Sequence, residues 1–324
     1  MCSSSLDGGE SLTKPDLSQY PSSSISTKQL KATFYLPDPQ KGYYRGTRFD
    51  WSGLLSRVEY GGHSFFCEFR ERQHDPLNHD DICGTAEEFG MTTTPLGFAE
   101  GKTGEPFVKI GIGVLERGND PEYAFWKKYK ILQPGNWNIQ TKPDSIEFTQ
   151  GLNTTQGWSY EYTKRVRLDD TAHTLTITRR LKNTGTKKID TDHYGHNFLK
   201  IDDVPAGPDY VFEFPFQPHF GEGSKPEGCV EIKDKSLVFL KQVPTGKSIW
   251  VRLDGFTKPS DNQMRIVNRR TGAAMTIRTD KPLLRLVYYS SDGVLAPEPF
   301  VKLELAPGET TEWRTTYEFE AGKQ

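Results

Sequence analysis

The segment from Ile189 to Asp202, IDTDHYGHNFLKID, concentrates groups that can exchange protons, because it holds two histidines, a tyrosine and three aspartates. Its residue types alternate as they would in a β-strand, in which successive side chains point to opposite faces. His193 then lies on a largely aliphatic face, whereas His196 shares the other face with Tyr194. Histidine is the side chain whose ordinary pKa suits proton donation near pH 7. We therefore interpret His196 as a candidate catalytic acid, with a purely structural histidine as the alternative, and His193 as a core residue.

A second unusual residue, Glu298, lies about a hundred positions later between Pro297 and Pro299, and it is the only charged residue of the segment GVLAPEPFV. Neither proline can donate a hydrogen bond to a neighbouring strand, so this pattern predicts the end or the irregular start of a strand. Apolar neighbours raise the pKa of a carboxyl group and make its carboxylate a better base near neutrality. We therefore expect Glu298 to be a catalytic base, with a solvated loop glutamate as the alternative.

A polar loop over residues 70–91 brings together His74, His79, Asp80 and Asp81. Histidine and aspartate can ligate a metal, but their spacing here matches neither a zinc signature nor a calcium-binding loop. Loops of a β-sandwich often carry binding residues. We therefore predict that His74 or His79 contacts a substrate, and we predict no metal site.

Arginines and aromatic residues supply further candidates for substrate binding. Arg48 and Arg72 could bind vicinal hydroxyls or a carboxylate through the guanidinium fork, although each is also a plausible surface arginine. Trp158, Tyr162 and Tyr194 could stack on the apolar face of a pyranose, although aromatic residues of a large sandwich mostly fill its core.

The rest of the chain reads as many short strands separated by turns, with no long helix and no repeat of fixed period. Segments 54–60 and 63–69 flank the turn Gly61-Gly62 and predict a hairpin, residues 107–116 predict one strand, and residues 300–305 and 313–319 predict a terminal hairpin. This pattern favours an all-β fold, a large antiparallel β-sandwich. We expect a disordered N-terminal arm over residues 1–28 and a single domain over residues 29–324.

Composition excludes several classes of partner. The formal charge is -2, from 41 basic and 43 acidic residues, so the sequence lacks the excess positive charge that attracts nucleic acid or an anionic membrane. No apolar run approaches the roughly 20 residues that span a bilayer. The four cysteines form no CxxC pair and favour a reduced, cytoplasmic compartment. The alternative is an exported lipoprotein that has lost its signal peptide and begins at the lipid-accepting Cys2.

Two motifs resemble those of the aldose 1-epimerase (galactose mutarotase-like) superfamily. The segment His196-Asn197-Phe198-Leu199-Lys200-Ile201 is similar to the His-x-Tyr/Phe-Phe-x-Val/Leu strand that carries the catalytic acid of that family. Pro297-Glu298-Pro299, followed by Leu305-Ala306-Pro307-Gly308-Glu309 and a last strand, looks like the family's ending, in which a glutamate is the base. The loop with His74 and His79 stands where the family places its first substrate-binding histidine. The segment YYRGTRFDWSG over residues 43–53 departs from the standard enzymes, whose Asn-Arg and Leu-His-Gly-Gly motifs are not evident, so the resemblance is to a divergent member.

The resemblance implies an isomerase that interconverts the anomers of a sugar. Glu298 would take the proton of the anomeric hydroxyl, and His196 would protonate the ring oxygen, without a metal or organic cofactor. The partner would be a mono- or oligosaccharide. Two alternatives on the same fold are a polysaccharide lyase, in which Tyr194 or His196 abstracts a proton from a uronate and Arg48 or Arg72 neutralises its carboxylate, and a non-catalytic glycan-binding protein.

Overall fold

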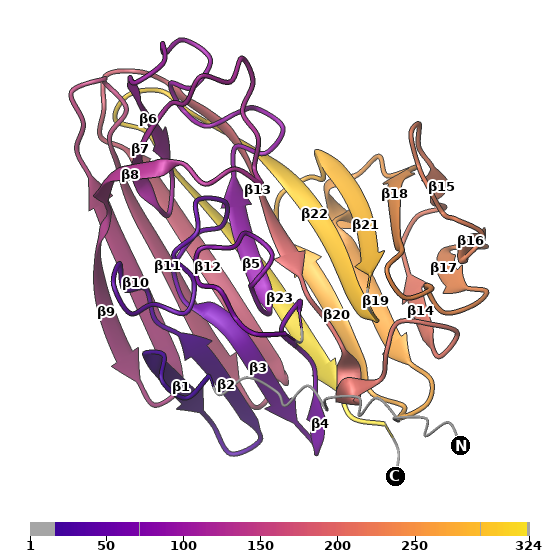
Figure 1. Cartoon of the computed structure of the whole chain (residues 1–324). Coiled ribbons are helices and arrows are strands. Elements are labelled where there is room, and N and C mark those ends of the chain that lie inside the picture. Colours follow the sequence, from indigo (N-terminus) through magenta and orange to yellow (C-terminus); the bar gives the residue numbers. More distant parts are fainter. Residues whose placement is uncertain (1–16, 71, 292, 323–324) are drawn as a thin grey trace, which may run out of the picture.

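The computed structural model describes residues 17–70, 72–291 and 293–322, and it confirms the predicted antiparallel β-sandwich. Its largest sheet has ten strands in the order β16-β17-β14-β19-β20-β23-β12-β11-β10-β9, which fan out in Figure 1 from β9 on the left to β16 on the right. These strands are β9 (Asn136–Lys142), β10 (Ser145–Leu152), β11 (Tyr160–Asp169), β12 (Thr174–Asn183), β14 (Tyr210–Glu213), β16 (Val230–Lys233), β17 (Ser236–Phe239), β19 (Gln263–Asn268), β20 (Ala274–Thr279) and β23 (Thr310–Glu320).

Three smaller sheets accompany it, with six, four and three strands in the orders β15-β18-β21-β22-β13-β5, β1-β2-β3-β4 and β6-β7-β8. The six-stranded sheet contains β5 (Thr85–Phe89), β13 (Ile189–Asn197), β15 (His219–Phe220), β18 (Ser248–Asp254), β21 (Arg285–Ser291) and β22 (Val294–Leu305). The others contain β1 (Ser22–Ser26), β2 (Leu30–Tyr35), β3 (Leu54–Tyr60), β4 (His63–Ser64), β6 (Pro106–Lys109), β7 (Gly113–Glu116) and β8 (Lys130–Pro134). Two short 3-10 helices, Ile201–Asp203 and Pro259–Asp261, complete the regular structure of the described residues.

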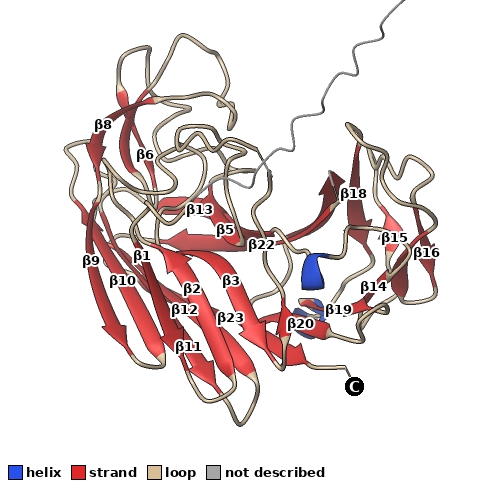
Figure 2. Ribbon diagram, turned by 60° about the horizontal axis from the view of Figure 1, so that its bottom comes forward, coloured by secondary structure: helices blue, strands red, loops and turns tan. Residues whose placement is uncertain are grey.

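The main core lies between the ten-stranded sheet and the sheets that cover its inner face. The strands alternate between buried and exposed positions, as in β12, where Leu175, Ile177 and Leu181 are buried and the threonines between them are half-buried. Leu175 and Ile177 belong to one core cluster with residues of the four-stranded and six-stranded sheets, including Phe34 and Leu286, and Leu181 belongs to a second cluster with Leu303. Each aliphatic side chain buried in this way stabilises the fold by roughly 1.5–3 kcal/mol. In Figure 2, strands β13, β22 and β5 lie in the middle of the molecule, between β9–β12 on one side and β14–β16 on the other.

Residues 107–116, predicted as one strand, form the hairpin β6–β7 instead. Gly111 at the turn has φ +82°, a conformation that glycine adopts without strain. A Cβ atom there would lie 2.5 Å from the Asp50 carboxylate, so the loop before β3 approaches this turn closely. The prediction failed because apolar residues lie on both sides of the turn between Val108 and Leu115, so the sequence pattern does not show where one strand ends and the next begins.

Pro297, Glu298 and Pro299 lie inside strand β22, so the prediction of a strand end or an irregular start is wrong. The reason is the direction in which the prolines face. The ladder between β13 and β22 runs through the pair Tyr194↔Phe300, and in the same register Leu199 and Leu295 exchange both main-chain hydrogen bonds. Between these two points the nitrogen atoms of both prolines, which carry no hydrogen to donate, face β13. The Asn197 side chain donates a hydrogen bond to the Pro297 carbonyl at 2.9 Å instead. The strand therefore passes through the prolines with an open stretch in its ladder.

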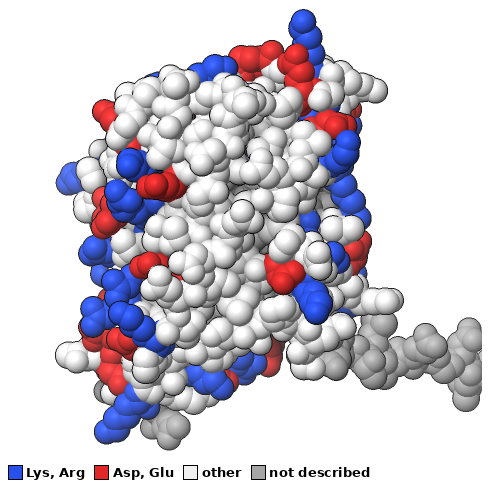
Figure 3. Space-filling model, turned by 90° about the vertical axis from the view of Figure 1, so that its left-hand side faces the viewer, with Lys and Arg blue, Asp and Glu red and all other residues white. Residues whose placement is uncertain are grey.

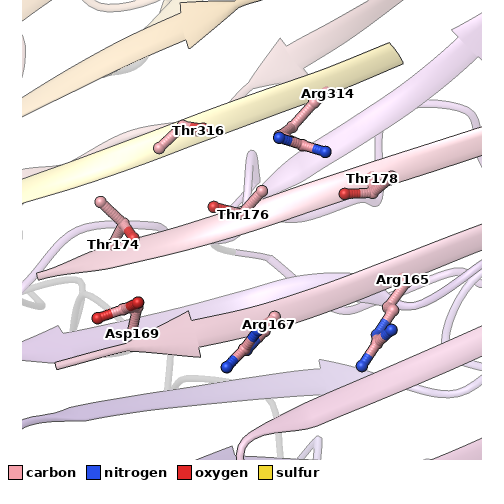
Figure 4. A pocket seen from close by; sticks show the side chains of 8 residues that line it. All are labelled: Arg165, Arg167, Asp169, Thr174, Thr176, Thr178, Arg314 and Thr316. Carbon is pink, nitrogen blue, oxygen red and sulfur yellow. The ribbon is translucent and has the colours of Figure 1, made fainter. Parts of the chain in front are cut away.

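The outer face of the ten-stranded sheet is polar. A groove of about 370 Å³ lies on it, and Figure 4 shows the side chains that line it: Arg165, Arg167, Asp169, Thr174, Thr176, Thr178, Arg314 and Thr316. Seen from the side of β9, the molecule carries charges of both signs mainly toward its margins and a largely uncharged centre (Figure 3). No single sign of charge dominates that view.

Several expectations concern the N-terminus and the cysteines. Strand β1 (Ser22–Ser26) falls within the arm predicted over residues 1–28, so this part of the arm is a paired strand, whereas residues 1–16, including Cys2, lie outside the described residues. Cys67, Cys83 and Cys229 are buried. In the described part of the chain, no helix is long and apolar enough to cross a lipid bilayer.

Candidate functional site

The outer face of the six-stranded sheet brings His196 of β13 and Glu298 of β22 into contact. The His196 Nε2 and Glu298 Oε1 atoms are 3.3 Å apart. The register that pairs Tyr194 with Phe300 and Leu199 with Leu295 sets His196 opposite Glu298. This position is of the kind that exchanges no main-chain hydrogen bonds, at which facing side chains come closest. Two residues a hundred positions apart thus meet because of strand register.

Aromatic rings surround this pair and exclude water from it. Phe198 stacks on the His196 imidazole with ring centres 4.1 Å apart, and Phe49, Phe69 and Tyr289 stand around it at 6.0, 6.4 and 6.2 Å. His196 is 5% exposed and Glu298 is 8% exposed. Burial of this kind disfavours the charged form of both groups.

The pair therefore holds one proton between its two members near neutral pH. Burial raises the pKa of Glu298 to about 8, against the opposing charges of Arg48 and Arg285. Burial, reinforced by the charge of Arg48, holds the pKa of His196 well below its usual value. At pH 7 the pair thus consists of a carboxylic acid and a neutral imidazole, or of the tautomer in which the proton has crossed to the imidazole. Because the two groups are in direct contact, the proton needs no intervening water to cross.

A charged network flanks the pair. The Arg48 guanidinium lies between the rings of Phe49 and Phe125, at 4.3 and 4.1 Å from their centres. Arg48 donates from Nε to Glu88 at 3.0 Å and from Nη2 to the Tyr194 hydroxyl at 3.0 Å. These contacts fix the orientation of the guanidinium beside the pair, where its charge acts on both members.

Glu88 is the centre of this network. It also accepts hydrogen bonds from the Tyr194 hydroxyl at 2.7 Å and from Lys109 Nζ at 2.8 Å, and Lys109 contacts the Tyr123 hydroxyl at 2.7 Å. Burial alone would raise the pKa of Glu88, but Lys109 and Arg48 lower it below its usual value. One buried carboxylate thus faces two cations, and the charge of the buried Asp192 also acts on Lys109.

The two histidines of the predicted binding loop lie in different surroundings. His79 Nε2 lies 3.0 Å from the Asp80 carboxylate, and its ring contacts Phe125, the residue that stacks on Arg48. The charge of Asp80 in turn influences the pKa of His196. His74 instead stacks on Tyr43 at 4.1 Å and hydrogen-bonds the Tyr43 carbonyl at 2.7 Å. The structure therefore places His79 on the side of the site and His74 in an aromatic stack.

Of the remaining residues predicted to bind substrate, some lie next to the His196–Glu298 pair and others lie away from it. Tyr194 and Arg48 lie next to the pair, as described. Arg72 is about half-exposed and pairs with Asp81 at 2.9 Å. Trp158 packs in the core, and its indole nitrogen bonds the Lys188 carbonyl. Tyr162 is fully buried between the sheets. Neither Trp158 nor Tyr162 contacts His196 or Glu298. Within the residues that the structure describes, no group of three His, Cys, Asp or Glu side chains is arranged to hold a metal ion.

A second charged network, which the sequence reading missed, lies on the opposite face of the same sheet. Glu87 precedes Glu88 on β5, so its side chain points inward, where it pairs bidentately with Arg179 and lies 3.3 Å from Lys164 and 3.2 Å from His193. Burial opposes ionisation of Glu87, but Arg179 and Lys164 hold its pKa well below its usual value. The available signal was the alternation of β12, in which Arg179 shares the face of Ile177 and Leu181. His193 is thus a hydrogen-bonded core residue in the structure.

This architecture is the galactose mutarotase-like fold. It is similar to the structure of a protein from Synechocystis sp. PCC 6803, with a TM-score of 0.59 at 11% identity over 95% of this chain and 98% of the other. It is also similar to a galactose mutarotase related enzyme from Lactobacillus acidophilus, with a TM-score of 0.56 at 11% identity over 94% and 98% of the two chains. An aldose epimerase homologue from C. elegans gives 0.52 at 14% identity over 94% and 99%. Comparison with protein-family profiles and with curated protein sequences finds no match.

Proposed function

We propose that the protein is an aldose 1-epimerase-like isomerase that interconverts the anomers of a sugar. The observation that carries the proposal is the direct contact of His196 with Glu298 in a water-poor site on this fold. General acid–base catalysis of ring opening requires one acid and one base within reach of the same sugar, and this pair supplies both.

The reaction balances on the one proton that the pair shares. In the tautomer with a Glu298 carboxylate and a His196 imidazolium, Glu298 removes the proton of the anomeric hydroxyl. The electron pair of that O–H bond forms the C1 carbonyl, the bond from C1 to the ring oxygen breaks, and His196 protonates that oxygen. After rotation about C1–C2, closure from the other face of the carbonyl reverses these transfers. In the open-chain complex the pair is in its other tautomer, a protonated Glu298 and a neutral His196, and ring closure itself restores the first tautomer.

The lyase alternative has less support because the Tyr194 hydroxyl is committed as a donor. It donates to Glu88 at 2.7 Å, and burial raises its pKa well above its ordinary value. A tyrosine in this state is a poor base for abstracting a proton from carbon.

Saturation-transfer NMR on freshly dissolved pure anomers tests the proposal. The wild-type protein should accelerate anomer exchange of at least one aldose, and Glu298→Gln and His196→Asn should each lower kcat by roughly 10²–10⁴-fold. Glu304→Gln is the matched control, since Glu304 lies on the same strand but is exposed and paired with Lys188. Absence of acceleration across a broad panel of aldoses would exclude this function, and a new ultraviolet-absorbing double bond from uronate polymers would favour the lyase.

A further inference from the structure

Arg285 is a candidate ligand-binding residue that shares a sheet face with the His196–Glu298 pair. It begins strand β21, where it lies opposite Phe300, and Val287 on the same face lies opposite Glu298. Its guanidinium carbon is 5.4 Å from the centre of the Trp250 ring and 5.8 Å from that of Phe300. Trp250 pairs in register with Tyr289 rather than with Arg285. To approach Trp250, the Arg285 side chain must therefore extend along the strand over Val287, which brings it beside Glu298.

Arg285 differs from the other arginines of this face because it lacks a counter-ion. Its buried Nε–H group donates to no acceptor, and no carboxylate in the described ranges of the chain forms an ion pair with it. By contrast, Arg48 is paired with Glu88, and Arg252 is paired with Asp254 at 2.8 Å. A buried donor without a partner destabilises a protein, and such a donor in a native structure indicates that something else satisfies it.

The charge of Arg285 lacks a counter-ion beside the pair. Glu298 and His196 share a single proton and carry no net charge near pH 7. Glu88 faces Arg48 and Lys109, and the buried Asp192 also acts on Lys109, so these charges are largely balanced within the protein. Arg285 acts on the pKa of Glu298 and so belongs to the surroundings of the pair. An anion bound here would be attracted by Arg285.

We propose that Arg285 binds an anionic substituent, a phosphate or a carboxylate, of the sugar that the His196–Glu298 pair holds, so that the substrate is an anionic aldose. This inference rests on the proposed function. The guanidinium fork matches both anions because it donates two parallel hydrogen bonds. The flanking Trp250 and Phe300 rings limit the competing hydration of the guanidinium and hold its plane. The aldose would therefore lie with its anomeric carbon at the pair and its charged substituent toward β18.

Isothermal titration calorimetry separates the two sources of the anion. The ligands are aldohexoses of the gluco, galacto and manno series, their 6-phosphates, and the corresponding uronic acids. Wild-type protein should bind either the phosphates or the uronates of at least one series roughly 10–100-fold more tightly than the neutral parent sugar. Arg285→Gln should remove this preference while leaving the affinity for the neutral sugar within about twofold. Arg278→Gln, which makes the same change of net charge on the other sheet, where Arg278 pairs with Glu318, should retain the preference.

Arg285→Lys provides a second variant that keeps the charge but loses the fork, and it should retain part of the preference. Equal affinity of the wild-type protein for neutral and anionic sugars overturns the inference, as does equal weakening of both by Arg285→Gln. The proposed function and the role of Arg285 can be refuted independently. Selective binding of an anionic aldose without anomer exchange would support the role of Arg285 and refute the isomerase function. Anomer exchange of neutral aldoses without any preference for anionic ones would support the isomerase function and refute the role of Arg285.

Discussion

Removal of the Glu298 carboxyl should change the pH dependence of the protein in a specific way. In the proposed mechanism the pair acts only while it holds one shared proton, because one member must be an acid and the other a base. It loses that proton with a pKa of about 8, the value to which burial raises Glu298. It gains a second proton only well below pH 6.5, because burial lowers the pKa of His196. We therefore expect kcat/KM of the wild-type protein to be flat between pH 6.5 and 7.5 and to fall above pH 8.

The size of the fall follows from simple titration. With a pKa of about 8, roughly nine-tenths of the protein holds the shared proton at pH 7 and about one-tenth holds it at pH 9, so kcat/KM should drop about tenfold per pH unit at high pH. The spontaneous rate of anomer exchange, measured without protein at each pH, must be subtracted. A rate that instead rises through pH 8 would show that Glu298 acts as an isolated base, and would refute the shared-proton mechanism.

Protein stability gives a second measure of the same group. In the unfolded chain Glu298 has its ordinary pKa of 4.5, and in the folded protein its pKa is raised to about 8. A raised pKa stabilises the folded state fully below pH 4.5, and this contribution is lost as the pH rises to 8. The loss is about 5 kcal/mol at most. Urea unfolding of wild type and Glu298→Gln across pH 5–9 should therefore show the wild type losing stability relative to the variant as pH rises. A constant difference between the two proteins would contradict the buried, proton-retaining carboxyl.

Two further substitutions test the flanking networks. Glu87→Gln leaves Arg179 buried without its counter-ion, so the free energy of unfolding, measured in urea, should fall by about 3–5 kcal/mol; a change below about 1 kcal/mol would mean that water reaches this network. Tyr194→Phe removes the hydroxyl that links Arg48 to Glu88 but no member of the acid–base pair, so kcat for anomer exchange should remain within about tenfold of wild type. Complete loss would assign Tyr194 a direct part in the chemistry.

Period-two alternation predicted more of this molecule than residue composition did. It assigned His193 and His196 to opposite faces, and the structure places His193 against Glu87 in the interior and His196 against Glu298 on the outer face. Alternation succeeds because the pleat of a strand fixes side-chain direction regardless of what covers each face. It did not reveal that both faces of β13 are buried, since the covering loops come from distant parts of the chain.

The charged residues were harder to place for the same reason. Arg179 falls on the aliphatic face of β12 in the sequence. Its burial is explained only by its ion pair with Glu87, which lies on a strand of a different sheet. Arg285 has no partner in the described chain, so no sequence pairing could indicate it. The prolines beside Glu298 were misjudged because their effect depends on which neighbouring strand they face, and register is a property of the whole sheet.

The prolines of β22 also determine how the sheet can deform. Neither Pro297 nor Pro299 has an amide hydrogen, so β13 and β22 can move apart between the Tyr194–Phe300 pair and the Leu199–Leu295 bridge without losing a hydrogen bond from either proline. The Asn197 amide, which donates to the Pro297 carbonyl, is the main tie to be broken. Separation of His196 and Glu298 along this stretch would thus leave the strand pairing on both sides intact, so a ligand can enter between the two side chains without unfolding the sheet.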